Sequence, residues 1–579
     1  MKKTGAWLVR YALEQIGVTH TFGIPGVHNT EIYDELESSE QIQPVLVTHE
    51  GCGAFMADAM SRTSGSIGTM LIVPAAGVTH AASGIGEAFL DGIPMLVISG
   101  GIRSDSEFEY QLHDMDQHKL LEPITKKTYK VESQQDVIPT IYEAYELAVS
   151  GEPGPVFVEV PVNVQLYKGE VDEITPFHKK EYHQKSAINE LLDQAAKLLT
   201  EAKRPGIFLG WGAVDAAEHS IALAEHLSAP VSTTLQGLSA FPANHPLHTG
   251  MSFGPAAVPA ATSAFESCDC LLAVGTRFSE IGTGSFGVKV PENLIHIDIN
   301  PSVFSVNYPA KVAIEGDSGQ VLEKLLEAVF RLQPEKRQDA AVQNQILQQK
   351  QAYRDEWMAH DSGDRVNPAL FFEGLRQHIG DEDFVVTDDG NHTFLTAELM
   401  PIHQSRRFIS PTDFNCMGYA VPAVIAAKMA NPQQQVVGII GDGAFLMTCM
   451  ELITASSLSI GAVFVVFNDG ELSQISQAQQ IPYNRKTCTQ LGNIRIRGIT
   501  EATGAAYIRM EDNSTVDSTL DEALSIAASN RPVVLDVNVD YSKKTRFTKG
   551  IVGTNLKRMP FQNKVRMIGR ALKRRVIPA

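Results

Sequence analysis

The stretch that decides the fold is GDGAFLMTCMELITASSLSIGAVFVVFNDGE, residues 441–471. The apolar run VVGII precedes it and a second run, AVFVVF, lies inside it, with a helical pattern between the two. Parallel strands joined by a right-handed helical crossover end on the same edge of a sheet, so Asp442 and Asp469 are predicted to be neighbours in space. Open α/β sheets bind their ligands at this carboxyl edge.

This pair of acidic residues predicts a site for a metal ion and a phosphate group. Gly441 and Gly443 are expected to take positive φ and let a ligand approach the backbone, and a helix beginning near Ala444 would present free amides to an anion. Two carboxylates without Cys or His favour Mg²⁺ or Ca²⁺ over zinc. An ordinary turn with a helix-capping Asp is the alternative for GDG alone, and the second acid, Asp469, favours the metal site.

Short β-rich apolar runs alternate with helical patterns along the chain, which is typical of parallel α/β domains. A chain of 579 residues is also too long for one hydrophobic core. Polar segments at residues 167–186 and 338–357 divide the pattern into three series. We therefore predict an α/β protein with three doubly wound parallel-sheet domains, at residues 1–170, 190–332 and 365–542, followed by a basic C-terminal tail at residues 543–579.

Composition excludes some classes of partner. The net charge of −19 argues against nucleic acid, which is bound through basic surface. Residues 1–17 read as an amphipathic helix without a signal-peptide core, and no apolar run reaches the roughly 18 residues that a membrane-spanning helix needs. Six scattered cysteines suit a reducing compartment. The sequence predicts a cytoplasmic protein with no stable membrane insertion.

The tail departs from this charge balance, because residues 543–579 contain twelve Lys or Arg and no Asp or Glu. We favour a tail that lies on the acidic body of its own chain or of a neighbouring subunit. A contact with a membrane or with nucleic acid is the alternative.

Asp442 of GDG is followed 27 residues later by Asp469 of NDG. This pattern resembles the thiamine diphosphate (ThDP) motif of 2-oxo-acid decarboxylases and acetolactate synthases, in which GDG is followed by NN. Other segments resemble acetolactate synthases in the same order, throughout the chain except the tail: VTHEGCGAFMADAMSR, EAFLDGIPMLVISG, SGEPGPVFVEVP, HPLHTGM, LIHIDINP and CMGYAVPAVIAAK. The resemblance implies an N-terminal pyrimidine-binding domain, a central domain of the FAD or nucleotide type, and a diphosphate-binding domain.

The resemblance also assigns cofactor residues. Mg²⁺ would be held by Asp442, by Asp469 in place of the usual Asn, and by the carbonyl oxygen of Glu471. Glu50 would contact the aminopyrimidine ring of ThDP and assist proton loss from the thiazolium. Met417 would keep the two cofactor rings facing each other, with core packing as the alternative. Further cofactor contacts are implied for Pro25, Gly26, Gly390, Asn391, His392, Asn415, Gly441, Gly443, Ala444 and Leu472.

Three histidines are further candidates for the catalytic site. His80 and His113 stand where the synthases carry Asn and Gln, and His28 falls in a loop that resembles one near the cofactor. A lone His is more often structural than catalytic, but three are predicted to converge here. Gln474 and Ala478 align with the Met and Trp that help many biosynthetic synthases select their acceptor, which points to a different acceptor or substrate.

The central series carries GWGA, GTRF and HIDIN, which resemble the segments that bind FAD in acetolactate synthases. This implies nucleotide contacts at Gly210, Gly212, Arg277 and Asp298. FAD, an ADP-type ligand and an empty domain stay open, because a glycine pair after a strand is weak evidence by itself.

The leading hypothesis is a Mg²⁺- and ThDP-dependent enzyme that decarboxylates a 2-oxo acid, pyruvate foremost, and transfers the acyl unit to a second carbonyl compound. The alternatives are a ThDP-dependent decarboxylase, a lyase or diketone hydrolase that cleaves a C–C bond without carboligation, and a catalytically silent binding subunit. The resemblance further implies a homodimer or homotetramer with active sites at the subunit interface, where Glu50 of one subunit faces Asp442 of another.

Overall fold

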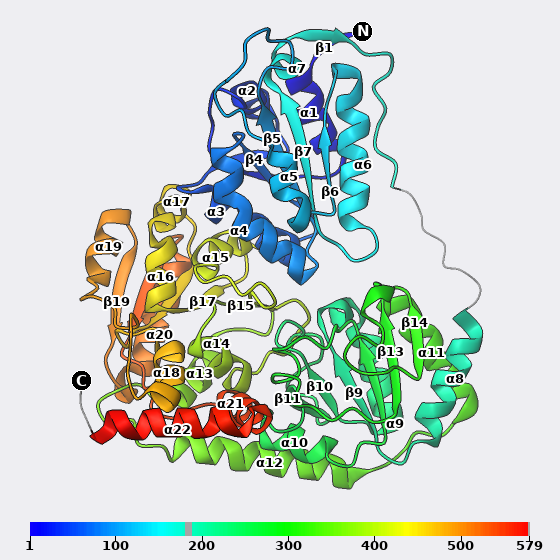
Figure 1. Ribbon diagram of the computed structural model, residues 1–579, viewed down its shortest axis with the longest axis vertical. Helices are drawn as coiled ribbons and strands as arrows, with labels where there is room; N and C mark the ends of the chain where they lie inside the picture. Colours follow the sequence, from blue (N-terminus) through cyan, green and yellow to red (C-terminus); the bar gives the residue numbers. More distant parts are fainter. Residues whose placement is uncertain (180–187, 577–579) are drawn as a thin grey trace.

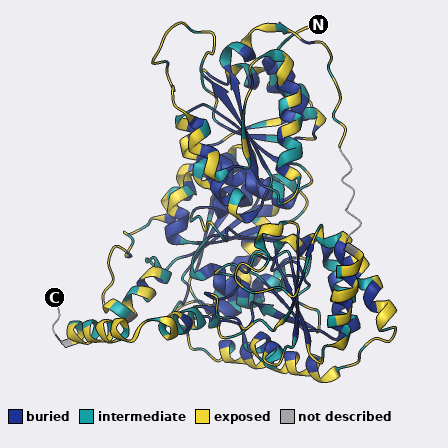
Figure 2. Ribbon diagram, turned by 45° about the vertical axis from the view of Figure 1, so that its right-hand side comes forward, coloured by how far each residue is buried: buried dark blue, intermediate teal, exposed yellow. Residues whose placement is uncertain are grey.

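The computed structural model describes residues 1–179 and 188–576. It contains three six-stranded sheets with helices on both faces, and every pairing of neighbouring strands in them is parallel (Figure 1). The strands are buried while the outer helix faces are exposed (Figure 2), as expected for the continuous apolar runs of parallel sheets. The predicted fold class is confirmed.

The N-terminal sheet has the strand order β3-β2-β4-β5-β7-β6. Its strands are β2 (His20–Gly23), β3 (Gln43–Leu46), β4 (Gly68–Ile72), β5 (Met95–Gly101), β6 (Lys127–Lys130) and β7 (Pro155–Pro161). Its helices are α1 (Gly5–Gln15), α2 (Thr30–Glu37), α3 (Glu50–Thr63), α4 (Ala76–Asp91), α5 (Gln117–Leu121), α6 (Val137–Val149) and α7 (Val162–Leu166). An additional antiparallel pair, β1 (Lys2–Thr4) with β8 (Lys168–Glu170), joins the two ends of this region.

The central sheet has the order β11-β10-β9-β12-β13-β14. It is built from β9 (Pro205–Leu209), β10 (Val231–Thr233), β11 (His248–Met251), β12 (Cys270–Val274), β13 (Asn293–Asp298) and β14 (Val312–Glu315), with helices α8 (Ile188–Glu201), α9 (Ala217–Leu227), α10 (Pro259–Phe265) and α11 (Ser318–Leu332). The polar segment at 338–357 forms the long helix α12 (Ala340–Met358), which runs beneath the central and C-terminal sheets (Figure 1). The other predicted linker, 167–186, lies partly outside the described residues.

The C-terminal sheet has the order β16-β15-β17-β18-β20-β19. Its strands are β15 (Phe384–Thr387), β16 (Phe408–Ile409), β17 (Val436–Gly441), β18 (Val463–Phe467), β19 (Ala506–Met510) and β20 (Val533–Val537). Its helices are α13 (Pro368–His378), α14 (Asn391–Leu399), α15 (Ala420–Ala430), α16 (Asp442–Thr448), α17 (Leu452–Ser457), α18 (Ser473–Tyr483), α19 (Ile496–Thr503) and α20 (Val516–Ala528). Strands β17 and β18 pair in parallel, with Gly441 opposite Phe467.

The N-terminal and C-terminal sheets are joined through α3, α4 and α15, which pack together (Figure 1). Buried polar groups fix this junction. Tyr419 Oη donates to Asp58 Oδ1 at 2.6 Å, and Arg62, completely buried, pairs with Asp58 and Asp91. Because an unpaired charge would be costly inside the protein, this network holds the two domains in one orientation.

The basic tail forms α21 (Arg546–Arg558) and α22 (Phe561–Val576). Arg546 and Lys543 pair with Glu356 of α12, whereas Arg558 donates to the carbonyl oxygens of Ser285 and Phe286, and Arg574 to that of Tyr483. The tail therefore lies on its own chain, mainly through backbone carbonyls. In the ranges that the structure describes, no helix is long and apolar enough to cross a membrane.

Candidate active site

A cavity of about 90 Å³ lies at the carboxyl edge of the C-terminal sheet, beyond the ends of β17 and β18. The residues predicted for cofactor, metal and substrate that line it are Gly390, Asn391, His392, Met417, Gly441, Asp442, Gly443, Ala444, Asp469, Glu471, Leu472 and Gln474. The parallel crossover is what gathers them, because it returns both strand ends to one edge.

Asp442 and Asp469 lie side by side in this cavity. Asp442 accepts hydrogen bonds from the backbone N–H groups of Gly443 (2.7 Å), Gly470 (2.7 Å) and Asp469 (3.2 Å). Burial and the neighbouring charge of Asp469 raise the pKa of Asp442 to about 6, and burial raises the pKa of Asp469. Asp442 is buried and Asp469 is half-buried, and their raised pKa values show that ionising both carboxyls is unfavourable unless a cation compensates their charge.

One carboxylate oxygen of this pair is free for a hard cation. Asp469 Oδ2 accepts from the Ser473 hydroxyl, whereas Asp469 Oδ1 is buried and has no hydrogen-bond partner. The Glu471 carboxylate forms an ion pair with Lys486 at 2.6 Å. Glu471 can therefore offer its main-chain carbonyl oxygen to a metal ion. Within the described residues no three His, Cys, Asp or Glu side chains gather as a metal cluster, so main-chain and non-protein oxygens would complete the coordination sphere.

Two local expectations for the GDG segment are wrong. Neither Gly441 nor Gly443 has a positive φ, and the helix begins at Asp442 rather than near Ala444. Glycine is needed for close packing instead: a Cβ on Gly443 would lie 2.4 Å from Leu472 Cδ2, and one on Gly441 would lie 3.0 Å from His392 Cε1. The glycines therefore let two loops close over the acidic pair. Positive φ is found at Gly390, at +150°.

Asp388 is a residue of this region that sequence reasoning missed. It is completely buried and accepts hydrogen bonds from the backbone N–H of Gly418 (2.8 Å) and Ala420 (2.7 Å). Burial raises its pKa to about 7. Asp388 thereby fixes the loop that carries Met417. Its neighbour Asp389 lines the cavity and forms a hydrogen bond with the side chain of Asn415. Asn415 itself does not line the cavity.

His392 is fully enclosed beneath the same loops. Burial lowers its pKa to about 3, so the imidazole is neutral, and its Nε2 has no hydrogen-bond partner. Tyr541 also lines the cavity, and burial beside the two acids raises its pKa well above its ordinary value. Tyr541 comes four residues after β20, near the C-terminal end of the domain, and no sequence motif marks it as a site residue.

A second group of predicted residues lies in the N-terminal domain. Glu50 opens α3 and is 6 % exposed, and its Oε2 lies 2.9 Å from His80 Nδ1. The His80 ring stacks on His49 at 4.6 Å between centroids, and His49 Nδ1 accepts from the N–H of Gly51. His49 was missed, since its role as a platform depends on tertiary packing.

His28 and His113 form a pair in this same domain. Their rings meet edge to face with centroids 5.0 Å apart. His28 is 8 % exposed, its Nδ1 has no hydrogen-bond partner, and burial together with His113 lowers its pKa. The adjacent loop also contains Pro25, which is exposed, and Gly26, which is half-buried. The N–H of Gly26 donates to Asn29 Oδ1 at 2.7 Å.

The structure does not bring these two groups into one cavity. All residues that line the 90 Å³ cavity belong to the C-terminal domain, and Glu50, His28, His80 and His113 do not line it. Gln474 lines it with a buried, unpartnered Oε1, whereas Ala478 is exposed on α18 outside it. Within one chain, the predicted site is therefore two separate half-sites.

A cleft of about 280 Å³ contains the four residues predicted in the central domain, Gly210, Gly212, Arg277 and Asp298. Arg277 pairs with Glu152 at 2.9 Å and approaches Asp413 at 3.5 Å, so residues of all three domains meet there. Burial raises the pKa of Asp298 to about 6. A Cβ on Gly210 would lie 2.0 Å from the Gly275 carbonyl oxygen, which explains the glycine by close backbone packing.

Models of the thiamine pyrophosphate enzymes match three parts of the chain: the N-terminal TPP binding domain at residues 3–120, the central domain at 192–325 and the C-terminal TPP binding domain at 388–537. The chain belongs to the thiamine pyrophosphate enzymes. The acidic pair of this thiamine pyrophosphate enzyme lies inside the matched C-terminal domain, and Glu50 lies inside the matched N-terminal domain.

Curated relatives of this thiamine pyrophosphate enzyme match over nearly the whole chain. It is 31% identical to the acetolactate synthase large subunit of Corynebacterium glutamicum, over 92% of this chain and 86% of the relative. It is 32% identical to the probable acetolactate synthase large subunit of Methanocaldococcus jannaschii, over 93% and 92%. It is 30% identical to the acetolactate synthase isozyme 3 large subunit of Escherichia coli, over 93% and 95%.

Proposed function

We propose that the chain is an acetolactate synthase-like enzyme, which decarboxylates a 2-oxo acid, foremost pyruvate, and joins the acyl unit to a second carbonyl compound. The observation that carries the proposal is the Asp442–Asp469 pair at the sheet edge of a TPP binding domain, in which Asp442 is buried and Asp469 Oδ1 is buried without a partner. The similarity of the whole chain to acetolactate synthase large subunits supports the reaction class.

In this proposal Asp442, Asp469 and the carbonyl oxygen of Glu471 hold Mg²⁺, which neutralises the diphosphate of ThDP. Gly390 and the first turn of α14, which begins at Asn391, offer backbone amides to the diphosphate. Met417, partly buried against the core beside this cavity, supports the cofactor rings. When bound, ThDP supplies a carbon nucleophile and an electron sink for decarboxylation.

Glu50 is proposed as the acid–base group that moves a proton at a ring nitrogen of the cofactor. Its burial at the start of α3 limits competition from water, and the hydrogen bond with His80 orients the carboxylate. His28 and His113 of one half-site and Gln474 of the other are proposed to bind substrate. A neutral, unpartnered His28 nitrogen is suited to accept or donate one hydrogen bond to a substrate oxygen.

Calorimetric titration of the purified protein with ThDP tests the cofactor assignment. We expect binding in the presence of Mg²⁺ and at least about tenfold weaker binding after chelation, since the two acids then repel the diphosphate. Equal ThDP affinity with and without a divalent ion would contradict the assigned role of Asp442 and Asp469.

The separation of the two half-sites supports a homodimer or homotetramer with each active site shared by two subunits. Co-expression of Glu50→Gln and Asp442→Asn subunits with different tags tests this. Each variant alone is expected to be inactive, whereas mixed dimers isolated by both tags would regain about half of wild-type activity, because one of their two sites carries neither change. The unfractionated, randomly assorted population would regain about a quarter, since about half of its dimers are mixed. If mixed oligomers isolated by both tags stay inactive, the shared site is wrong.

The central cleft is proposed to bind a nucleotide, FAD or an ADP-type ligand. We expect the purified protein either to show flavin absorption or to bind added FAD or ADP in a calorimeter. Arg277→Ala should weaken that binding by about tenfold if the guanidinium meets a phosphate. If the protein contains no flavin and binds neither FAD nor ADP, the proposal that this cleft binds a nucleotide is wrong.

A further inference from the structure

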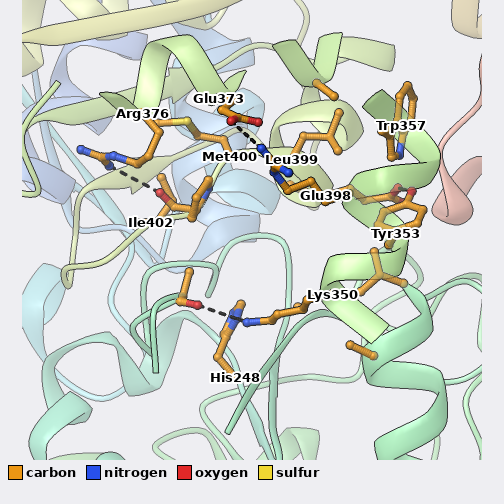
Figure 3. Close-up of a pocket in the computed structure, with 18 of the residues that line it drawn as sticks. His248, Lys350, Tyr353, Trp357, Glu373, Arg376, Glu398, Leu399, Met400 and Ile402 are labelled. Carbon is orange, nitrogen blue, oxygen red and sulfur yellow. Dashed lines mark hydrogen bonds and ion pairs between the residues drawn. The ribbon is translucent and has the colours of Figure 1, made fainter. Parts of the chain in front are cut away.

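A third cavity, of about 550 Å³, lies between the central domain, α12 and the C-terminal domain (Figure 3). It shares no lining residue with the candidate active site. Much of its wall is apolar, and its size is that of small-molecule pockets. The apolar wall includes Leu238, Val258, Trp357, Met358, Met400 and Ile402.

Lys350 of α12 places a cationic side chain in the wall of this cavity. Its Nζ donates to the carbonyl oxygen of Ala243 and to His248 Nδ1, each at 3.2 Å (Figure 3). Among the described residues no carboxylate forms an ion pair with Lys350. Burial lowers the pKa of Lys350 to about 8, so the side chain is mostly charged at neutral pH although its partners are neutral. A positive charge is thus held in the wall without an anion.

His248 adds a hydrogen-bond donor beside this charge. An ammonium group can only donate, so His248 Nδ1 accepts and the proton sits on Nε2. Burial and Lys350 hold the pKa of His248 well below its ordinary value, which keeps the ring neutral. The residue is 7 % exposed, and its Nε2 is buried without a hydrogen-bond partner. A buried N–H without an acceptor is costly and marks a place where a ligand atom or water is missing.

The other charged groups of the wall are already engaged. Arg376 donates to the carbonyl oxygens of Ile379 and Gly380, and Arg354 pairs with Glu373 at 2.6 Å. Glu398 accepts from the Tyr353 hydroxyl and from the backbone N–H of Phe547 at 2.8 Å. His403 pairs with Asp381 at 2.7 Å. Of the charged and imidazole groups of the wall, the Lys350 ammonium and the His248 N–H are therefore left for a guest, beside apolar surface and uncharged polar side chains such as Asn244 and Gln349.

We propose that this cavity binds a small amphipathic carboxylate, whose acid group meets Lys350 and His248 and whose hydrocarbon part packs on the apolar wall around Trp357 and Met400. A carboxylate would supply both the missing countercharge and the missing acceptor. The guest would also contact α14, since Ala397, Glu398 and Leu399 line this cavity while Asn391 and His392 of the same helix line the candidate active site.

Calorimetry on the full-length protein with ThDP and Mg²⁺ tests the proposal, with octanoate as the probe and octanamide as its uncharged match. Octanoate is expected to bind, and octanamide to bind at least about tenfold more weakly, which is the loss of one charge-assisted hydrogen bond. Lys350→Met keeps the length and apolar stem of the side chain and should weaken octanoate binding by about the same factor, whereas Lys350→Arg should retain it.

A second measurement does not depend on the folding of a Lys350 variant. Trp357 lines the cavity, so 8-bromooctanoate should quench tryptophan fluorescence in the wild-type chain and quench it less in Trp357→Phe, which retains Trp7 and Trp211. The proposal is overturned if octanoate does not bind, if it binds Lys350→Met as tightly as wild type, or if quenching is unchanged in Trp357→Phe.

Discussion

Glu50→Gln is expected to lower kcat by about 10²- to 10⁴-fold, the usual contribution of a general acid–base group, while ThDP binds with nearly unchanged affinity. Glutamine has the shape of glutamate and can still hydrogen-bond to His80, but it cannot exchange a proton at the cofactor ring. Steady-state turnover and calorimetric ThDP titration on the same preparation check both halves of this expectation.

The matched control is Glu87→Gln, in another buried glutamate of the same domain. Burial raises the pKa of Glu87 to about 9, and its two oxygens accept from the backbone N–H groups of Thr412 and Cys416. Glutamine can keep one of these two hydrogen bonds, and the change leaves the Glu50–His80 contact in place. Glu87→Gln should therefore keep most of the activity. Full turnover in Glu50→Gln would show that the acid–base role belongs to another residue.

Asp442→Asn is expected to weaken Mg²⁺-dependent ThDP binding by about 100-fold or more, because it removes the carboxylate of the GDG motif, whereas the motif that the chain resembles has Asn at the position of Asp469. Asp469→Asn is the comparison, and it should keep activity. Its amide oxygen can still face the metal while its nitrogen donates to Ser473. Loss of ThDP binding in Asp469→Asn, or its retention in Asp442→Asn, would contradict the assignment of the ligands.

Without Mg²⁺ and ThDP, Asp442→Asn should not lower the stability of the protein, although it weakens cofactor binding. The pKa of Asp442 is raised to about 6 in the folded protein, so the carboxyl favours folding below its unfolded pKa and this contribution is lost as the pH rises through 6. At pH 8, with a chelator, Asp442→Asn should therefore be no less stable than wild type in thermal unfolding. With Mg²⁺ and ThDP present it should be less stable, because binding stabilises only the wild type.

Sequence reasoning found the elements whose causes are local. Continuous apolar runs predicted the parallel strands, and the crossover between β17 and β18 predicted that Asp442 and Asp469 meet. The predicted start of α16, near Ala444, was two residues too late. Gly441 stays extended and the Asp442 carboxylate accepts from the N–H of Gly443, so the helix begins at Asp442.

Features that depend on distant segments could not be predicted. Asp388 is one of two consecutive acids in VVTDDGN, and only the fold shows that it binds the loop of Met417. His49 stacks on His80 through packing of α3 against α4, and β8 pairs with β1 from the other end of the domain. The walls of the Lys350 cavity come from three separate parts of the chain, and although His248 lies in the segment HPLHTGM, nothing in the sequence places Lys350 beside it.

Product analysis after incubation with pyruvate tests the central claim most directly. The full-length protein, supplied with ThDP and Mg²⁺ and with FAD present, should release CO₂ and form acetolactate, and Glu50→Gln should form neither above background. Acetaldehyde as the main product would support a simple decarboxylase, and cleavage of a diketone without pyruvate turnover would support a hydrolase. Either result, or no turnover of pyruvate at all, would contradict the acetolactate synthase-like function.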